Sequence, residues 1–222
     1  MKLIVISNTK GTYPETRLVT ELFDNGLDTL HLRKPSFSTH KIEEYLNQIP
    51  EPYWSKIILH SKHKLAIKYS VKGIHYTRKH RNKKIRLWLM EKYLKRKIPK
   101  LKITTSFHSL DSLTEETKKY DYVLLSPVFD SISKSKYQGR FNDQNFRVFL
   151  KKVKHKVYAL GGISEDKIDK VKTMDFSGVA VHGAIWESEN PIKTFNAIKE
   201  KCKEKPKSYP LQDLTHPQEQ ES

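Results

Sequence analysis

The chain alternates short apolar runs rich in β-branched residues with longer segments of helical periodicity. This alternation is typical of repeated βα units, which form a parallel sheet. The predicted strands are Lys2–Ser7, Thr29–Arg33, Lys56–His60, Gly73–Tyr76, Leu101–Phe107, Tyr120–Val128, Lys156–Leu160 and Gly178–Val181. Eight such units in roughly 200 residues fit a single-domain (β/α)8 TIM barrel near its lower size limit. A doubly wound open sheet is the alternative, but it usually has fewer strands at this length.

The sequence also predicts the domain boundary and the cellular compartment. We expect the barrel to span residues 1–205, and residues 206–222, which gain Pro, Gln and Ser, to form a C-terminal tail. The single cysteine, Cys202, excludes an intrachain disulfide framework and fits a reducing compartment. Because no apolar run approaches the ~20 residues that span a bilayer, we expect a soluble, cytoplasmic protein without a membrane partner.

The charge favours anionic partners. The 222 residues include 42 Lys and Arg against 25 Asp and Glu, which gives a formal net charge of +17. Much of the excess lies in residues 78–100, where Glu91 is the only acidic residue. A polyanion-binding or nucleic-acid-binding surface is one interpretation. The other is a solvated basic helix, and the helical spacing favours it by predicting inward packing of Ile85, Leu87, Trp88, Leu89 and Tyr93.

Polar residues at the carboxyl ends of the strands indicate where the chemistry lies, because barrel active sites are built there. These residues are Asn8, His31, Arg33, His60, His75, His108, Ser131, Ser133, Lys134, Gly161, Gly162 and His182. The set is basic and rich in hydroxyls, which suits a phosphorylated ligand. The two glycines before Ser164 let backbone approach a phosphate at the start of a helix. A histidine such as His108 can both take and return a proton near neutral pH.

Six motifs in order carry a family resemblance: "LHLRK", "GIHYT", "TTSFHS", "SPVFDSISK", "ALGGI" and "GVAVHGAI". Over nearly all of residues 2–200, the chain resembles thiamine phosphate synthase and its relative the thiazole tautomerase (TenI-like proteins). The resemblance implies a (β/α)8 enzyme of thiamine biosynthesis that handles the thiazole phosphate half of thiamin. Its partners would be phosphorylated thiazole and pyrimidine precursors, and a homodimer is among the assemblies that it allows.

The resemblance also implies roles for individual residues. Arg33, Ser106 and Lys134 match positions that hold pyrophosphate or pyrimidine in the synthase, and Ser131 and Ser133 stand where the synthase has two threonines. Gly162, Val181 and His182 match the backbone cradle for the thiazole phosphate, and His108 matches the proton-transferring histidine of the tautomerase. We include His31 and Gly161 among the candidate binding residues because they lie at the same strand ends.

The chain departs from the synthase pattern where the synthase binds Mg²⁺. His60-Ser61-Lys62 replaces an Asn-Asp-Asp run, and Arg78-Lys79-His80 stands where an acid is expected. Since Mg²⁺ prefers oxygen ligands, we predict no metal ligands, and a Mg²⁺ requirement only for a synthase-like activity. The synthase's "QLREK" has become "HLRKP", so the second basic side chain of that motif could be supplied here only by Lys34, one position earlier.

These departures favour a tautomerase-like proton transfer by His108, without a cofactor. Synthase activity, the joining of pyrimidine pyrophosphate to thiazole phosphate with release of pyrophosphate, is the alternative, because Lys62 and Arg78 could hold a pyrophosphate by direct charge pairing. An inactive paralogue that binds without turnover is also left open. A basic polyanion or nucleic-acid binder is the alternative from another class, and nucleic acid is not the expected partner.

Overall fold

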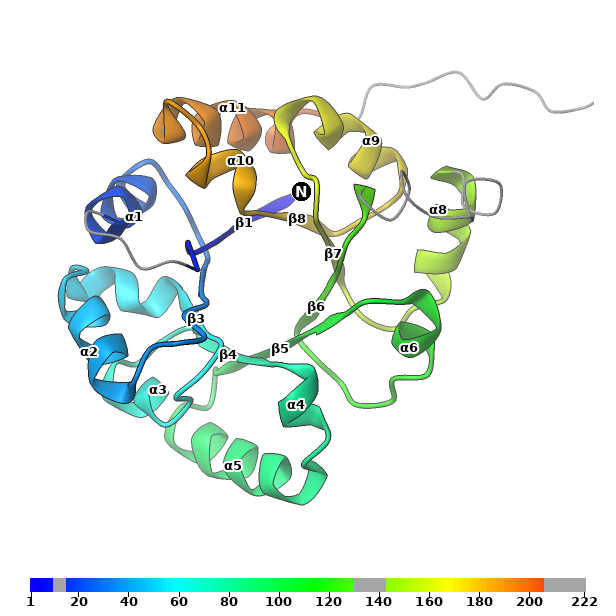
Figure 1. Cartoon of the computed structure of the whole chain (residues 1–222). Helices are drawn as coiled ribbons and strands as arrows, with labels where there is room; N and C mark the ends of the chain where they lie inside the picture. The colour runs from blue at the N-terminus through cyan, green and yellow to red at the C-terminus, as the bar shows by residue number, and fades with distance from the viewer. Residues whose placement is uncertain (10–14, 130–142, 206–222) are drawn as a thin grey trace, which may run out of the picture.

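The computed structural model describes residues 1–9, 15–129 and 143–205, and it forms a closed parallel barrel (Figure 1). The strands follow one another around the barrel in chain order: β1 (Lys2–Ile6), β2 (Leu30–Leu32), β3 (Ile57–Leu59), β4 (Gly73–Tyr76), β5 (Lys102–Phe107), β6 (Tyr122–Leu125), β7 (Val157–Leu160) and β8 (Gly178–Val181). The barrel closes where β8 pairs with β1, from Gly178 opposite Lys2 to Val181 opposite Val5. The predicted TIM barrel is therefore confirmed, and the open sheet is excluded.

Helices and 3₁₀ turns surround the barrel (Figure 1). They are α1 (Glu15–Asp24), α2 (Thr39–Asn47), a 3₁₀ turn (Glu51–Lys56), α3 (Leu65–Lys68), α4 (Arg78–Arg81), α5 (Lys84–Lys97), α6 (Leu110–Thr114), α8 (Asp143–Lys152), a second 3₁₀ turn (Glu165–Lys167), α9 (Ile168–Thr173), α10 (Gly183–Trp186) and α11 (Pro191–Lys203). The predicted tail, residues 206–222, lies outside the described residues. No helix in the described part of the chain is long and apolar enough to cross a membrane.

The first helix, α1, ends in a turn at Gly26. Gly26 adopts φ +89°, and the N–H groups of Gly26 and Leu27 donate to the carbonyls of Phe23 and Leu22 at 2.9 Å each. This pair of bonds satisfies carbonyls at the end of α1 and turns the chain toward β2.

The inside of the barrel is divided into an apolar and a polar half. The apolar half is a buried cluster of Ile4, Ile6, Tyr122, Leu124, Tyr158 and Ala180 from β1, β6, β7 and β8. The polar half comes from β2, β4 and β5, where His31, His75 and Thr104 are buried. His31 contacts Tyr122 across the barrel, since β2 and β6 are opposite strands. The polar half therefore forms the floor beneath the strand ends where a ligand is expected.

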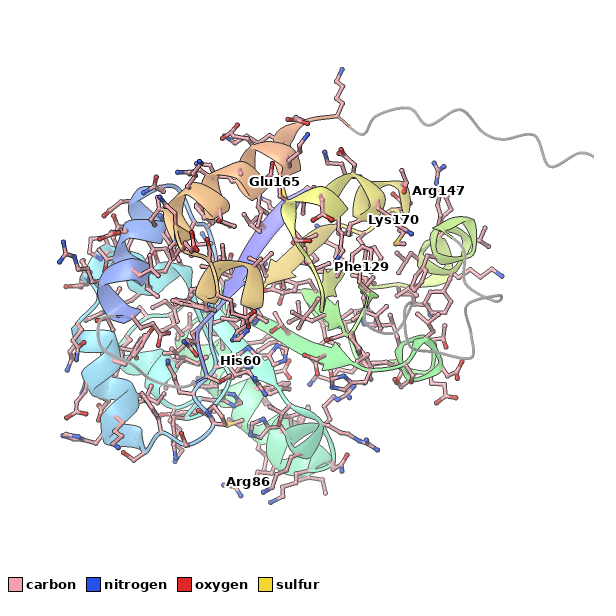
Figure 2. The ribbon with its side chains drawn as sticks, turned by 45° about the horizontal axis from the view of Figure 1, so that its top comes forward. His60, Arg86, Phe129, Arg147, Glu165 and Lys170 are labelled. Atoms are coloured by element: carbon pink, nitrogen blue, oxygen red, sulfur yellow. The ribbon has the colours of Figure 1, made fainter. Side chains whose placement is uncertain are left out.

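The packing predicted for α5 is wrong for most of the expected residues. Leu87 is buried, but Ile85, Trp88, Leu89 and Tyr93 are 78%, 57%, 55% and 52% exposed. The helix packs through Leu87 and Leu94, which lie two turns apart on one side, and the opposite side faces outward. Arg86 lies on the outside of this helix (Figure 2). The outward side therefore combines apolar and basic residues, and its Lys92 ammonium lies 5.1 Å from the Trp88 ring centroid.

Candidate functional site

Most of the predicted site residues lie at or just below the carboxyl end of the barrel. His31 and Ser106 lie in strands β2 and β5, Arg33 follows β2, and His108 follows β5. Gly161 and Gly162 follow β7, and Val181 and His182 lie at the end of β8. The remaining three predicted residues, Ser131, Ser133 and Lys134, fall outside the described residues.

A hydrogen bond defines which ring nitrogen of His108 carries the proton. Its Nδ1 lies 2.9 Å from the carbonyl oxygen of Ser126, and because a carbonyl only accepts, Nδ1 carries the hydrogen. In a neutral ring, Nε2 then holds the lone pair. The side chain is exposed, so this nitrogen is open to a ligand. Ser109 precedes the following helix, α6, and caps it, because its hydroxyl accepts from the Ser112 N–H.

The two glycines form a tight turn against the end of β6. Gly161 has φ +97° and Gly162 has φ +62°, a region that side chains disfavour. The Phe129 N–H donates to the Gly161 carbonyl at 3.3 Å, and a Cβ on Gly161 would lie 2.7 Å from Pro127 Cα. Glycine at position 161 therefore allows the loop after β7 to lie directly on the loop after β6.

His182 and Arg33 share the region beyond β8 and β2. Burial lowers the pKa of His182, and the Arg33 guanidinium lowers it further. Within the described residues, the buried Nε2 of His182 has no hydrogen-bond partner. A buried nitrogen of this kind is costly unless something bonds to it, which fits a site that a polar ligand completes.

Lys34 does not supply the displaced cation that the sequence suggested. Its ammonium is buried, forms an ion pair with Glu15 and donates to the Asn8 carbonyl at 2.5 Å. The hydroxyl of Tyr45 donates to the other Glu15 oxygen at 2.8 Å. Lys34 is therefore part of the structural framework beneath the mouth.

A buried histidine network, which the sequence analysis did not recognise as a cluster, lies below the strand ends. His31 Nδ1 is 2.8 Å from His60 Nε2, and His31 Nε2 is 2.5 Å from the Tyr122 hydroxyl. His75 Nδ1 and Nε2 each lie 2.8 Å from a hydroxyl, those of Thr104 and Ser106. The available signal was one histidine in each of three consecutive predicted strands.

The residues at the expected Mg²⁺ positions do not suit that ion. His60-Ser61-Lys62 and Arg78-Lys79-His80 supply no carboxylate, and Lys62 and Arg78 are both exposed cations. Mg²⁺ is a hard ion that prefers carboxylate, phosphate and water oxygens. These two segments therefore lack the oxygen ligands for Mg²⁺ that a synthase would have at the same positions.

The chain is similar to known proteins in family, sequence and structure. The model of a family described as thiamine monophosphate synthase matches residues 3–185. A curated thiamine-phosphate synthase of Flavobacterium psychrophilum is 22% identical over 210 residues, covering 90% of this chain and 98% of the relative. A second, of Pyrococcus furiosus, is 24% identical over 204 residues, covering 90% and 93%.

Two solved structures have the same architecture over almost their whole length. A thiamine phosphate pyrophosphorylase of Bacteroides thetaiotaomicron superposes with a TM-score of 0.72 and 27% identity, covering 91% of this chain and 98% of that one. The corresponding protein of Pyrococcus furiosus gives a TM-score of 0.70 at 21% identity, covering 91% and 95%. The similarity therefore extends over the whole barrel and is not limited to one motif.

Proposed function

Because the chain belongs to the thiamine monophosphate synthase family, we propose that it binds a thiazole phosphate at the barrel mouth and that His108 transfers a proton on the thiazole. The observation that carries this proposal is the hydrogen bond from His108 Nδ1 to the Ser126 carbonyl, which leaves Nε2 as a proton acceptor. In the reaction, Nε2 removes a proton from one position of a thiazole carboxylate phosphate and returns it to another. Substrate and product are isomers, so no cofactor is consumed.

The phosphate would bind where the loops after β7 and β8 meet. Backbone N–H groups around Gly161, Gly162, Val181 and His182 form the proposed cradle, a common place for phosphate in barrels of this type. Arg33 adds a positive charge close enough to lower the pKa of His182. The unpartnered Nε2 of His182 is buried, so the ring would have to turn toward the mouth to donate to a phosphate oxygen.

The thiazole ring would lie above the polar half of the barrel. Ser106 is half-buried there and is held by His75, while His31 lies deeper and is completely buried. We therefore assign Ser106 a contact with the ligand, and His31 a supporting role through the buried network. Ser131, Ser133 and Lys134 remain proposed contributors of phosphate contacts on the grounds of their sequence match.

The test is an isomerisation assay with the less stable thiazole carboxylate phosphate tautomer. His108→Ala should lower kcat by about 10²- to 10⁴-fold, the usual loss for a general acid–base, while ligand binding measured by calorimetry persists. His40→Ala, an exposed histidine on α2, is the matched control and should leave the rate unchanged. Isomerisation by the wild type that is unaffected by His108→Ala would refute the proposal.

Synthase activity is the second candidate, and the observation that favours it is that both full-length curated relatives are thiamine-phosphate synthases. The matching assay supplies pyrimidine pyrophosphate and thiazole phosphate, with and without Mg²⁺. Formation of thiamin phosphate that requires Mg²⁺ would replace the isomerase proposal by the synthase. The family match does not favour a polyanion binder as the primary function.

A further inference from the structure

Three histidines from consecutive βα units converge inside the barrel. His31 lies in β2, His60 directly follows β3 and His75 lies in β4, and one ring nitrogen of each is within 4.8 Å of the other two. His31, His60 and His75 are 0%, 8% and 2% exposed. Figure 2 shows His60 inside the ring of helices. The cluster is therefore enclosed by the barrel and approaches solvent through His60.

Hydroxyl groups fix the orientation of two of these rings. Thr104 has one hydroxyl hydrogen, which it donates to the Ile74 carbonyl at 3.4 Å, so it accepts from His75 Nδ1. His75 Nε2 then carries a lone pair. In His31, Nε2 lies 2.5 Å from the Tyr122 hydroxyl, and Nδ1 points toward His60. Histidines that bind metal ions are oriented by partners on their second nitrogen in the same way.

Burial favours the uncharged form of all three rings. Burial lowers the pKa of His31 to about 3 and lowers the pKa values of His60 and His75 well below their ordinary value. A neutral imidazole offers a nitrogen lone pair, the form in which histidine binds metal ions.

We infer that His31, His60 and His75 form a binding site for a divalent transition-metal ion of the zinc type, with Ser106 beside its open fourth position. Imidazole nitrogen suits Zn²⁺, Co²⁺, Ni²⁺ and Cu²⁺, whereas Mg²⁺ and Ca²⁺ select oxygen. Three protein nitrogens with one open position are typical of catalytic rather than structural zinc sites. The location of Ser106 follows from the 2.8 Å between its hydroxyl and His75 Nε2.

Binding requires the network to rearrange, and the Ser106 hydroxyl, which donates to the lone pair of His75 Nε2 at 2.8 Å, must release that nitrogen. Two nitrogens on one tetrahedral zinc ion lie roughly 3.3–3.4 Å apart, given Zn–N distances of about 2.0–2.1 Å. The 2.8 Å between His31 and His60 must therefore widen, and the proton between them must leave. The rings of His60 and His75 also stack at 4.0 Å, so one of them must tilt to direct its lone pair at the ion. These costs predict weaker binding than in a preformed site.

The sequence supplies matched variants. His31 and His60 stand where the synthases that the chain resembles have Gln and Asn. The variants His31→Gln and His60→Asn therefore keep a polar side chain of similar size while removing the imidazole. The control is His155→Gln, because His155 precedes β7 and therefore lies at the opposite end of the barrel. This inference is independent of the role proposed for His108.

The experiment titrates Co²⁺ into protein that has been stripped with a chelator and carries no histidine tag. Wild type and His155→Gln should develop the visible absorption of tetrahedral Co²⁺ at one equivalent, and Zn²⁺ should abolish it and raise the melting temperature. His31→Gln and His60→Asn should weaken the apparent Co²⁺ affinity by more than about tenfold, because even loss of a partner that only orients a metal ligand typically costs about 10- to 100-fold. Equal Co²⁺ binding by wild type and both variants would refute the site.

A measurement on wild type alone decides the matter if the variants do not fold. X-ray absorption of the zinc-loaded protein should show imidazole scattering from three nitrogens at about 2.0–2.1 Å. A shell of oxygen ligands only, or the absence of stoichiometric zinc, would overturn the inference.

Discussion

The ammonium of Lys34 and the carboxylate of Glu15 form an ion pair that is almost completely buried, with side chains 0% and 3% exposed. Tyr45 completes the group by donating to Glu15 at 2.8 Å. The pair joins the segment after β2 to the start of α1 beneath the barrel mouth. Removing one charge from such a pair is more damaging than removing both, because a single buried charge stays unpaired.

Glu15→Gln should therefore lower the free energy of unfolding by about 3–5 kcal/mol, measured by urea denaturation. Gln keeps an oxygen for Tyr45, so the loss reports on the unpaired Lys34 charge. Glu15→Gln combined with Lys34→Met removes that charge and should recover most of the stability. A double variant no more stable than Glu15→Gln would contradict this account.

The turn after β7 provides a second prediction. Gly161→Ala places a Cβ 2.7 Å from Pro127 Cα at φ +97°, so it combines an unfavourable backbone conformation with a backbone clash. Gly26→Ala is the matched control, because Gly26 has φ +89° but its nearest neighbour to a Cβ would be the Lys199 Nζ at 3.7 Å. The control should cost about 1–2 kcal/mol in unfolding free energy, and Gly161→Ala clearly more. Equal losses would show that Pro127 moves away from the added Cβ without a measurable cost in unfolding free energy.

The barrel could be predicted because its strands are marked locally. Gly73–Tyr76 and Gly178–Val181 appear in the structure with the predicted bounds, since each is a short run that begins with glycine and contains strand-favouring residues such as Ile74, Tyr76 and Val179. Predicted strand Tyr120–Val128 was too long, and β6 covers only Tyr122–Leu125. Beyond Leu125 the chain remains buried at Val128, so burial continues where sheet pairing has stopped.

The site could be predicted only in part, because the sequence does not determine which inward residues meet. The residues His31, His60 and His75 were each placed near strand ends, yet their contact depends on the stagger between neighbouring strands. Lys34 looked available as a cation until its pairing with Glu15, 19 positions away in the chain, was known. Periodicity predicts which side of an element is inside, and three-dimensional pairing determines which groups remain free.

The helix α5 shows the same limit and yields a third prediction. Its sequence has two apolar stripes, and periodicity alone did not reveal that Leu94 lies on the buried one and Trp88 on the exposed one. Trp88→Ser should change the free energy of unfolding by no more than about 0.5 kcal/mol, as for other exposed positions. Leu94→Ala should cost about 2–5 kcal/mol by leaving a cavity. A large loss with Trp88→Ser would mean that this side of the helix is covered in solution.

The contact between Lys72 and Asp28 gives a pH-dependent prediction. Partial burial alone would raise the pKa of Asp28, but the hydrogen bond and charge of Lys72 outweigh it and hold that pKa below its ordinary value. A carboxyl with a lowered folded-state pKa contributes stability above its unfolded pKa, and this contribution is lost as pH falls through the folded-state pKa. The Asp28 side chain is 62% exposed, so the contribution is modest.

Lys72→Met should therefore lower the free energy of unfolding by up to about 1 kcal/mol near pH 7, measured by urea denaturation. The difference from wild type should shrink as the pH is lowered below about 4, where Asp28 becomes protonated in both proteins. Lys100→Met, at an exposed lysine, is the control and should show no such convergence. A Lys72→Met deficit that stays constant down to about pH 3 would assign the stabilisation to the other bonds of Lys72, which reach the Asp28 carbonyl and the Thr29 hydroxyl.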